Sequence, residues 1–463
     1  MPDQLMKGMM PDSRGDETET EVPKKAEFEG FAECLLFSGP AKITVDGDGL
    51  LIAAALDQLP VPYGEITQFT FANYRLEIVT VCGTVTISQM GQTGQWLYNH
   101  LYTAYNAAVL KALLVEGSHT REVSGSYSAE ENGAIVHGEA VIRLYPDCIC
   151  VLPAGDSGRR IPFCFVSGME KGNFSLTLSL LTGERYTFSK LGYGTEPFTG
   201  EVTAALRSLR ERSLVQLQET EKTLTSLQAA MAAKLMPEGV NAAIGKLSAA
   251  APVLVTGLEK LIKESRIADS YPVLKGLCGE ERLFVGMKAP AKEEEQPVPP
   301  EMPSLSDNGE ETEEKISGPP KPLVWLIAAG STTAAVELAL PGAEAAATYL
   351  YRIQGDPETF AMILNRGMEA TGFRRELFTL SDEELAKPCH MTEAMLIRRT
   401  PALQLMRKYF AGRVIHSGRW QQEMEKHLAS GSAPAGTKTT FCTNCGAKLN
   451  GSPKFCGECG TKL

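Results

Sequence analysis

The stretches Gly39-Pro-Ala41-Lys-Ile43-Thr-Val45 and Gly138-Glu-Ala140-Val-Ile142-Arg-Leu144 decide the fold, because they are two copies of one pattern about 100 residues apart. Both largely alternate small or apolar residues with polar ones, the period of two typical of strands with one buried face. More matched segments follow in the same order: Val61-Pro-Tyr63 with Ile161-Pro-Phe163, Asn73-Tyr-Arg-Leu76 with Asn173-Phe-Ser-Leu176, and Thr86-Ile-Ser88 with Thr187-Phe-Ser189. The sequence therefore predicts an internal repeat built from short antiparallel strands.

Each copy closes with an amphipathic helix, predicted over residues 95–114 in the first and 198–217 in the second. Turn residues such as Asp46-Gly-Asp-Gly49 and Gly155-Asp-Ser-Gly158 separate the strands. The predicted repeats occupy residues 28–118 and 127–217.

Antiparallel strands followed by one C-terminal helix, in a unit of this size, resemble the pleckstrin-homology-like (PH-like) fold. The resemblance implies that the turn between the first two strands is the place for Lys and Arg that hold a phosphoinositide. The turns assigned to that place here are Asp46-Gly-Asp48-Gly and Tyr145-Pro-Asp147, which are acidic. We therefore expect protein-binding or spacing modules rather than lipid-binding ones.

The rest of the chain predicts an overall α+β, multi-domain protein. Leucines at helical spacing predict a helical hairpin over 218–270, and an intermolecular coiled coil is disfavoured because heptads are not sustained. Residues 271–428 read as a mixed α+β domain, with strands near 282–288, 323–329 and 347–353 and one helix over 394–410. The segment 289–322 either interrupts this domain or separates two domains.

The charge is uneven. The chain has 45 Lys+Arg and 56 Asp+Glu, a net charge of -11, and it is 43% hydrophobic. Residues 1–27 and the Pro-rich 289–322 are strongly acidic, which predicts disorder. Residues 429–440 read as a flexible linker. An acidic chain disfavours a general nucleic-acid coat or a polybasic membrane binder. Without a signal-peptide pattern or an apolar span, the expected location is cytoplasmic, with no membrane association.

The pattern with the clearest chemistry is Cys442-Thr-Asn-Cys445-Gly followed by Cys456-Gly-Glu-Cys459-Gly. Four thiolates from two such pairs suit one tetrahedral ion with Zn–S distances of about 2.3 Å. Residues 441–463 resemble the short zinc ribbon found at the end of many bacterial proteins. This implies one structural Zn²⁺ held by Cys442, Cys445, Cys456 and Cys459, with no open position for catalysis. The alternative, a redox CxxC pair, requires a strand–helix context that these residues lack.

No constellation points to an enzyme, a catalytic residue or a small-molecule substrate. The six His are dispersed, and Gly155-Asp-Ser157-Gly158, which spells a serine-nucleophile motif, reads as a turn. The favoured prediction is a non-enzymatic, zinc-binding scaffold or adaptor that binds other proteins through its PH-like modules and tethered ribbon. The alternative is a nucleic-acid-binding regulatory protein using the ribbon and the basic segment 396–427. An unrecognised enzyme within 323–428 stays open.

Overall fold

We describe the protein from a computed structural model of residues 25–289, 322–339 and 347–428, with the backbone of two short paired strands, β21 (Thr440–Phe441) and β22 (Lys448–Leu449). The predicted segments 1–27, 289–322, 429–440 and 441–463 lie wholly or largely outside these residues. The chain forms two compact units. Unit 1 comprises Met1–Ala205, Ala370–Gly372 and Thr379–Pro401; unit 2 comprises Leu206–Glu369, Phe373–Phe378 and Ala402–Leu463.

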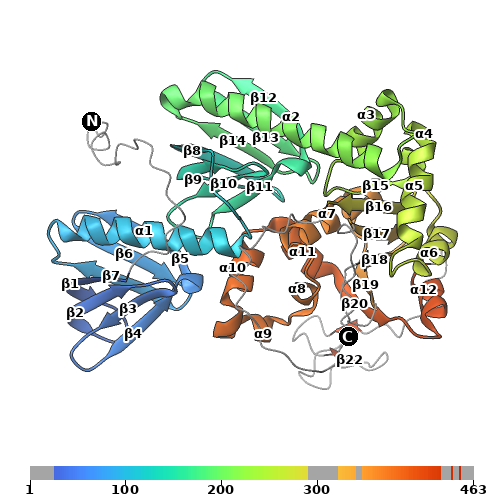
Figure 1. Ribbon diagram of the computed structural model, residues 1–463. Helices are drawn as coiled ribbons and strands as arrows, with labels where there is room; N and C mark the ends of the chain where they lie inside the picture. Colours follow the sequence, from blue (N-terminus) through green and yellow to red (C-terminus); the bar gives the residue numbers. More distant parts are fainter. Residues whose placement is uncertain (1–24, 290–321, 340–346, 429–439, 442–447, 450–463) are drawn as a thin grey trace, which may run out of the picture. The chain divides into compact units, whose positions relative to one another are not determined.

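Unit 1 contains two sheets of seven antiparallel strands with one shared strand order (Figure 1). The first runs β4-β3-β2-β1-β7-β6-β5, and the second runs β11-β10-β9-β8-β14-β13-β12. The first repeat consists of β1 (Ala26–Glu33), β2 (Ser38–Val45), β3 (Gly49–Ala53), β4 (Gln58–Pro62), β5 (Ile66–Ala72), β6 (Arg75–Thr80), β7 (Gly83–Ser88) and α1 (Thr93–Ala112). The second consists of β8 (Arg121–Glu131), β9 (Ala134–Leu144), β10 (Cys148–Leu152), β11 (Arg159–Pro162), β12 (Val166–Gly172), β13 (Ser175–Leu180), β14 (Arg185–Ser189) and α2 (Thr195–Thr220).

The repeat predicted from the sequence is therefore confirmed at the level of two antiparallel sheets, each followed by a helix that packs on it (Figure 1). The alternation in the two deciding stretches places Ile43 and Ile142 in the two cores, where both are fully buried. In each copy the helix contributes a buried face, with Leu97 and Tyr105 on α1 and Phe198 on α2.

The correspondence extends to backbone detail. A β-bulge interrupts β5 between Ile66 and Gln68, and a bulge interrupts β12 at the equivalent place, between Val166 and Gly168. Gly30 and Gly125 are also equivalent: a Cβ on Gly30 would lie 3.1 Å from Ser88 O, and one on Gly125 would lie 2.7 Å from Ser189 O. Both copies thus need a glycine where the first strand passes the end of the last strand.

The structure corrects the assignment of the first turn. Strand β1 begins at Ala26, so the acidic turn Asp46–Asp48 connects β2 to β3 rather than the first two strands. The turn between β1 and β2 is Cys34-Leu35-Leu36-Phe37, and in repeat 2 it is Asn132-Gly133. Strands β1 and β8 were not predicted, because the matched stretches at Gly39 and Gly138 belong to the second strand of each copy.

The hairpin expected over 218–270 is also corrected, since this region forms several short helices. Helix α2 ends at Thr220, and α3 (Ser226–Leu235) begins anew because Thr225 and Gln228 form a capping box. A short strand, β15 (Ala242–Ala243), precedes α4 (Ile244–Ala250), and Pro252 stands at the first position of α5 (Pro252–Lys263). Helix α6 (Ser270–Cys278) follows. Leucine spacing does not reveal these interruptions.

Unit 2 is built on a six-stranded antiparallel sheet in the order β15-β16-β17-β18-β19-β20. Its further strands are β16 (Leu283–Lys288), β17 (Leu323–Ala329), β18 (Thr333–Ala339), β19 (Ala347–Arg352) and β20 (Phe410–Ile415). Strand β16 pairs along its whole length with β17, so the strands on either side of residues 290–321 belong to one sheet. The remaining helices of unit 2 are α7 (Pro357–Ala370), α8 (Glu376–Thr379), α11 (Pro401–Tyr409) and α12 (Trp420–Leu428). The last residues of α7 and α8 are assigned to unit 1.

One segment leaves unit 2 and packs within unit 1. It contains α9 (Asp382–Leu385) and α10 (Met391–Arg398), and α10 lies against α1. The single helix predicted over 394–410 is wrong, because the structure interrupts it at Arg399–Thr400 and starts α11 at Pro401. Proline cannot donate the backbone hydrogen bond that a helix interior requires, and it restricts the residue before it.

Candidate protein-docking site

Three hairpin turns of repeat 1 carry exposed apolar side chains. These are the β1–β2 turn (34–37), the β3–β4 turn (54–57) and the β6–β7 turn (81–82), and the antiparallel register places them at the same end of the sheet. Leu35 is 87% exposed and Leu56 is 96% exposed; Leu36 and Val81 are also exposed. We call Leu35, Leu36, Leu56 and Val81 the turn patch. A Cβ on Gly83 would lie 3.4 Å from Leu35 Cδ1, so the first and third turns adjoin.

The turns satisfy their own backbone groups, which leaves these side chains directed away from the core. Cys34 N–H donates to Phe37 O at 3.0 Å, and Ala54 N–H donates to Asp57 O at 2.8 Å. The 34–37 and 54–57 turns contain no Lys or Arg, and Glu33 and Asp57 are exposed acidic residues at these turns. The exposed Lys42, which is paired in register with Ala53, forms an ion pair with Glu27. Exposed leucines gathered on neighbouring turns are typical of a surface that binds another protein.

The same end of repeat 2 is a docking surface within unit 1. Its β10–β11 turn (153–158) packs on the bulge of β5: Phe69 N–H donates to Ala154 O at 3.1 Å, and Asp156 N–H donates to Thr67 O at 2.9 Å. Gly155 forms an isolated antiparallel bridge with Gln68. A Cβ on Gly155 would lie 2.7 Å from Thr67 O, so this close approach of two backbones requires glycine.

A cluster of buried polar side chains in repeat 2 stabilises the conformation of the docked β10–β11 turn. Arg159 Nε lies 3.0 Å from both carboxylate oxygens of Glu131, and Tyr186 Oη donates to Glu131 Oε1 at 2.6 Å. Arg159 also donates to Gly158 O at 3.0 Å. The hydroxyl of Ser157 lies 2.8 Å from Tyr127 Oη, so Tyr127 and not a histidine is its side-chain neighbour. The four-residue motif 155–158 is part of the turn between β10 and β11, and it contacts β5 of repeat 1.

The basic residues predicted to form a nucleic-acid-binding face are divided between the two units. Arg398 and Arg399 belong to unit 1, whereas Arg407, Lys408, Arg413, Arg419 and Lys426 belong to unit 2. Arg399 is 1% exposed, and it donates to Tyr105 Oη at 2.6 Å and to Met395 O at 3.2 Å. Burial lowers the pKa of Arg399 from its usual range. Arg398 donates to Gly64 O, and Arg407 donates to Leu377 O at 3.1 Å.

The predicted zinc ligands Cys442, Cys445, Cys456 and Cys459 lie outside the described residues. Within the described ranges, no three His, Cys, Asp or Glu side chains gather as a metal site. The cysteines there are free thiols, and Cys148 and Cys150 are both buried, with their sulfurs 4.0 Å apart. The hydrogen bond with Cys150, together with burial, raises the pKa of Cys148 well above its usual range, which makes this thiol a weak nucleophile.

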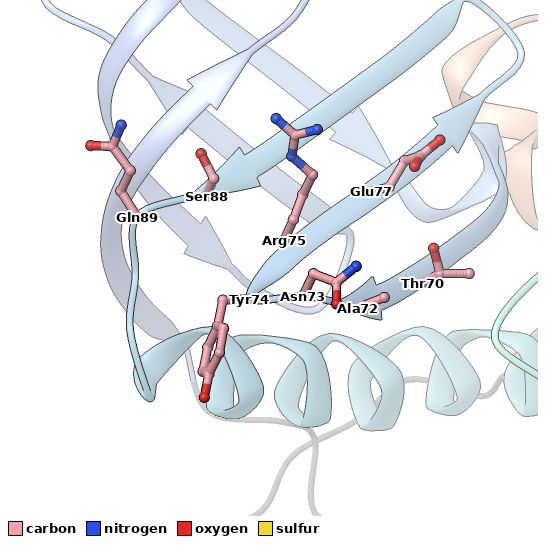
Figure 2. A pocket seen from close by; sticks show the side chains of 8 residues that line it. All are labelled: Thr70, Ala72, Asn73, Tyr74, Arg75, Glu77, Ser88 and Gln89. Atoms are coloured by element: carbon pink, nitrogen blue, oxygen red, sulfur yellow. The ribbon is translucent and has the colours of Figure 1, made fainter. Parts of the chain in front are cut away.

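A shallow hollow of about 520 Å³ lies at the opposite end of repeat 1, beside the β5–β6 turn. Figure 2 shows Tyr74 beside α1, with Arg75 and Glu77 on β6. Tyr74 has a positive φ of 59° and is exposed. The lining residues are largely exposed and polar, which gives the hollow little of the desolvation that small-molecule sites use.

Comparison with known proteins gives little further information. No family model matches the chain, and no curated protein matches it at a significant level. Among solved structures, the chain is similar to one in a structure described as the Spt16D Pob3N heterodimer. The two are 13% identical, the match covers 34% of this chain and 84% of that one, and the TM-score is 0.16. A similarity at this level does not bear on function. None of the helices in the described ranges combines the length and apolar character that crossing a lipid bilayer requires.

The turn patch is the feature that the sequence analysis missed. Its signal was present in Cys34-Leu35-Leu36-Phe37, an apolar run where a turn between strands is ordinarily polar. Because the strand before it, β1, was not predicted, this run was not identified as a turn.

Proposed function

We propose that this protein is a non-enzymatic adaptor whose two PH-like repeats form a platform for binding other proteins. The observation that carries the proposal is the turn patch of repeat 1. Burying an exposed leucine contributes about 1.5–3 kcal/mol, so Leu35, Leu36 and Leu56 are suitable anchors for a partner surface. The acidic Glu33 and Asp57 beside the patch, and the lack of Lys and Arg in the 34–37 and 54–57 turns, favour a protein over an anionic lipid or nucleic acid.

A second part of the proposal is a tethered zinc ribbon. Cys442, Cys445, Cys456 and Cys459 have the spacing of a closed, structural Zn²⁺ site, and the polar linker 429–440 precedes them. A ribbon on such a linker is held at a high effective concentration for any partner already bound by the repeats.

The proposal is tested by purifying the tagged full-length chain from the cells in which it occurs naturally. The proteins that co-purify are quantified for three versions: the natural sequence, a Leu35→Ser/Leu36→Ser variant, and a Leu227→Ser control on exposed α3. We expect the turn variant to lose proteins that the control retains. Identical sets of partners from all three versions would contradict a docking role for the turn patch. Salt-sensitive retention of nucleic acid instead would support the alternative function.

Metal content is measured on the same preparations by mass spectrometry. We expect one zinc per chain in the full-length protein and none in a chain that ends at Ala429. Absence of metal from both would refute the ribbon.

A further inference from the structure

The end of the sheet that carries the turn patch differs between the two repeats. Repeat 1 joins β1 to β2 by the apolar Cys34-Leu35-Leu36-Phe37, whereas repeat 2 joins β8 to β9 by the polar Asn132-Gly133. The β10–β11 turn of repeat 2 is docked on β5, but Leu56 in the corresponding β3–β4 turn of repeat 1 is 96% exposed. Repeat 1 therefore has apolar turns that the described part of the chain leaves exposed.

The two repeats also differ in the chain that precedes them. Only residues 113–120 connect α1 to β8, the first strand of repeat 2. Repeat 1 is preceded by residues 1–24, which lie outside the described residues. They include Leu5-Met6-Lys7-Gly8-Met9-Met10, which we call the methionine segment. The repeat with the exposed apolar turns is thus also the one preceded by an apolar stretch of chain.

The methionine segment matches the turn patch better in composition than the other parts of the chain outside the described ranges. Four of its six residues are large and apolar, whereas no six consecutive residues of 290–321, 340–346 or 429–463 contain more than two such residues. Methionine is unbranched and adaptable, so it fits irregular apolar surfaces such as leucines presented by separate turns.

The charges of the two surfaces are complementary. The charged side chain of the methionine segment is Lys7, and the exposed charges in and beside the 34–37 and 54–57 turns are the acidic Glu33 and Asp57. Segment 290–321 has nine acidic and three basic residues, so these carboxylates would repel it. Opposite charges at the rim of an apolar contact favour the correct partner over others.

The chain is long enough for the methionine segment to reach the turn patch of its own molecule. Strand β1 begins at Ala26 and ends at Glu33, beside the 34–37 turn, so the patch lies about 25 Å, one strand length, from the start of β1. Residues 11–25 can span up to about 50 Å when extended. A tether of this length gives an effective concentration of about 1 mM.

We propose that the methionine segment docks on the turn patch of the same chain and competes there with protein partners. This inference rests on the proposed function, because it takes the turn patch as a docking site and adds its regulator. A weak contact is sufficient. At an effective concentration of about 1 mM, a dissociation constant of about 0.1 mM keeps roughly nine-tenths of the patches occupied and weakens partner binding about tenfold.

Photo-crosslinking in the full-length chain tests the contact directly. Benzoylphenylalanine replaces Met6, and mass spectrometry after irradiation identifies the peptides to which it has become joined. We expect crosslinks to the turns 34–37, 54–57 or 81–82 within a single chain. The same photoreactive residue in place of Thr18 is the matched control, because it lies in the same stretch of chain but outside the methionine segment. It should not enrich these turns.

Two substitutions separate the apolar and the charged parts of the contact. Leu56→Asp removes an exposed apolar side chain from the patch and should lower the crosslink yield from position 6 about threefold or more. Lys7→Glu should lower the yield about twofold or more, because it places like charges together. Adding Asp57→Lys to the Lys7→Glu chain should restore the yield.

A fluorescent peptide of residues 1–14, added to the full-length protein, measures how accessible the patch is. It competes with the chain's own methionine segment, so it should bind the natural protein weakly. Met6→Asp/Met9→Asp frees the patch, and we expect the peptide to bind this variant about tenfold more tightly. Thr18→Asp/Thr20→Asp adds the same charge outside the methionine segment and should leave the affinity unchanged.

Crosslinks from position 6 that join two chains, or that avoid the turn patch, overturn the inference. Equal affinity of the peptide for the natural protein and for Met6→Asp/Met9→Asp overturns it too. Neither result affects the proposed function, which depends on whether Leu35→Ser/Leu36→Ser releases other proteins. Crosslinks within one chain, together with identical captured proteins, would establish the docked segment and refute the adaptor role of the patch.

Discussion

Arg399 donates a hydrogen bond to the hydroxyl of Tyr105 at 2.6 Å, and both side chains are buried. The two residues are 294 positions apart in the sequence. The guanidinium also lies 5.8 Å from the centre of the Tyr105 ring, and among the residues that the structure describes its Nε has no hydrogen-bond partner. A basic residue that the sequence assigned to a surface is thus part of the packing between α10 and α1.

Tyr105→Phe removes the hydroxyl that accepts this hydrogen bond. Because Arg399 is buried and charged, we expect a loss of about 1.5–3 kcal/mol in the free energy of unfolding of unit 1. Denaturant titration measures it. Tyr74→Phe removes an exposed hydroxyl and should change stability by less than about 0.5 kcal/mol. Equal effects of the two substitutions would contradict a structural role for the Arg399–Tyr105 pair.

Glu131→Gln leaves Arg159 buried without its carboxylate partner. We expect a loss of about 3 kcal/mol or more, together with faster hydrogen exchange of the Asp156 amide, since Arg159 holds the docked turn. The control is Glu170→Gln, which breaks the exposed pair with Arg185 and should cost at most about 1 kcal/mol. Unchanged exchange at Asp156 would show that the cluster does not hold the turn.

Stability should fall in strong alkali, in part through Tyr102. Its hydroxyl donates to Leu152 O in the other repeat, and burial raises the pKa of Tyr102 from an ordinary value of 10 to about 12. Between these values the unfolded chain releases this proton and the folded chain retains it, so stability decreases as pH rises from 10 to 12. Tyr102→Phe should show a shallower decrease in denaturant titrations across this range. Parallel curves for the two proteins would exclude the contribution of Tyr102.

Cys442→Ser or Cys459→Ser should abolish zinc binding and leave the thermal unfolding of residues 30–428 unchanged. The physical reason is that a four-cysteine ribbon derives its folding free energy largely from its metal and is separated from the body by a polar linker. Scanning calorimetry with and without a chelator provides the measurement. A large decrease in the main transition would mean that the ribbon and the body do not fold independently.

Part of the architecture follows from the sequence because it repeats. The alternation around Ile43 and Ile142 and the matched Val61-Pro-Tyr63 and Ile161-Pro-Phe163 were enough to predict two antiparallel sheets, each with a C-terminal helix. Strand β1 was not predicted because its match to β8, Glu27-Phe-Glu-Gly30 with Glu122-Val-Ser-Gly125, has an offset of 95 residues, whereas the other matched segments are about 100 residues apart. Because β1 was not predicted, the turn patch was not predicted either.

Long-range packing explains the other failures. Nothing local in residues 379–401 distinguishes a helix of unit 2 from one that packs in unit 1, so Arg398 and Arg399 looked like surface charges. Their partners, Gly64 and Tyr105, lie in the first quarter of the chain. The contact between Gly155 and Gln68 was not predicted for the same reason, because the two residues are far apart in the sequence. Gly155 itself was assigned to a turn.

The packing of α10 on α1 also has a consequence for biosynthesis. The ribosome makes Gly64 and Tyr105 early, but their partners Arg398 and Arg399 emerge 334 and 294 residues later. At about 5–20 residues per second, that delay is roughly 15–70 s. During this time repeat 2 is completed, but the surface of α1 that packs on α10 has no partner from α10. Unit 1 therefore reaches its final form only after Arg398 and Arg399 have been synthesised.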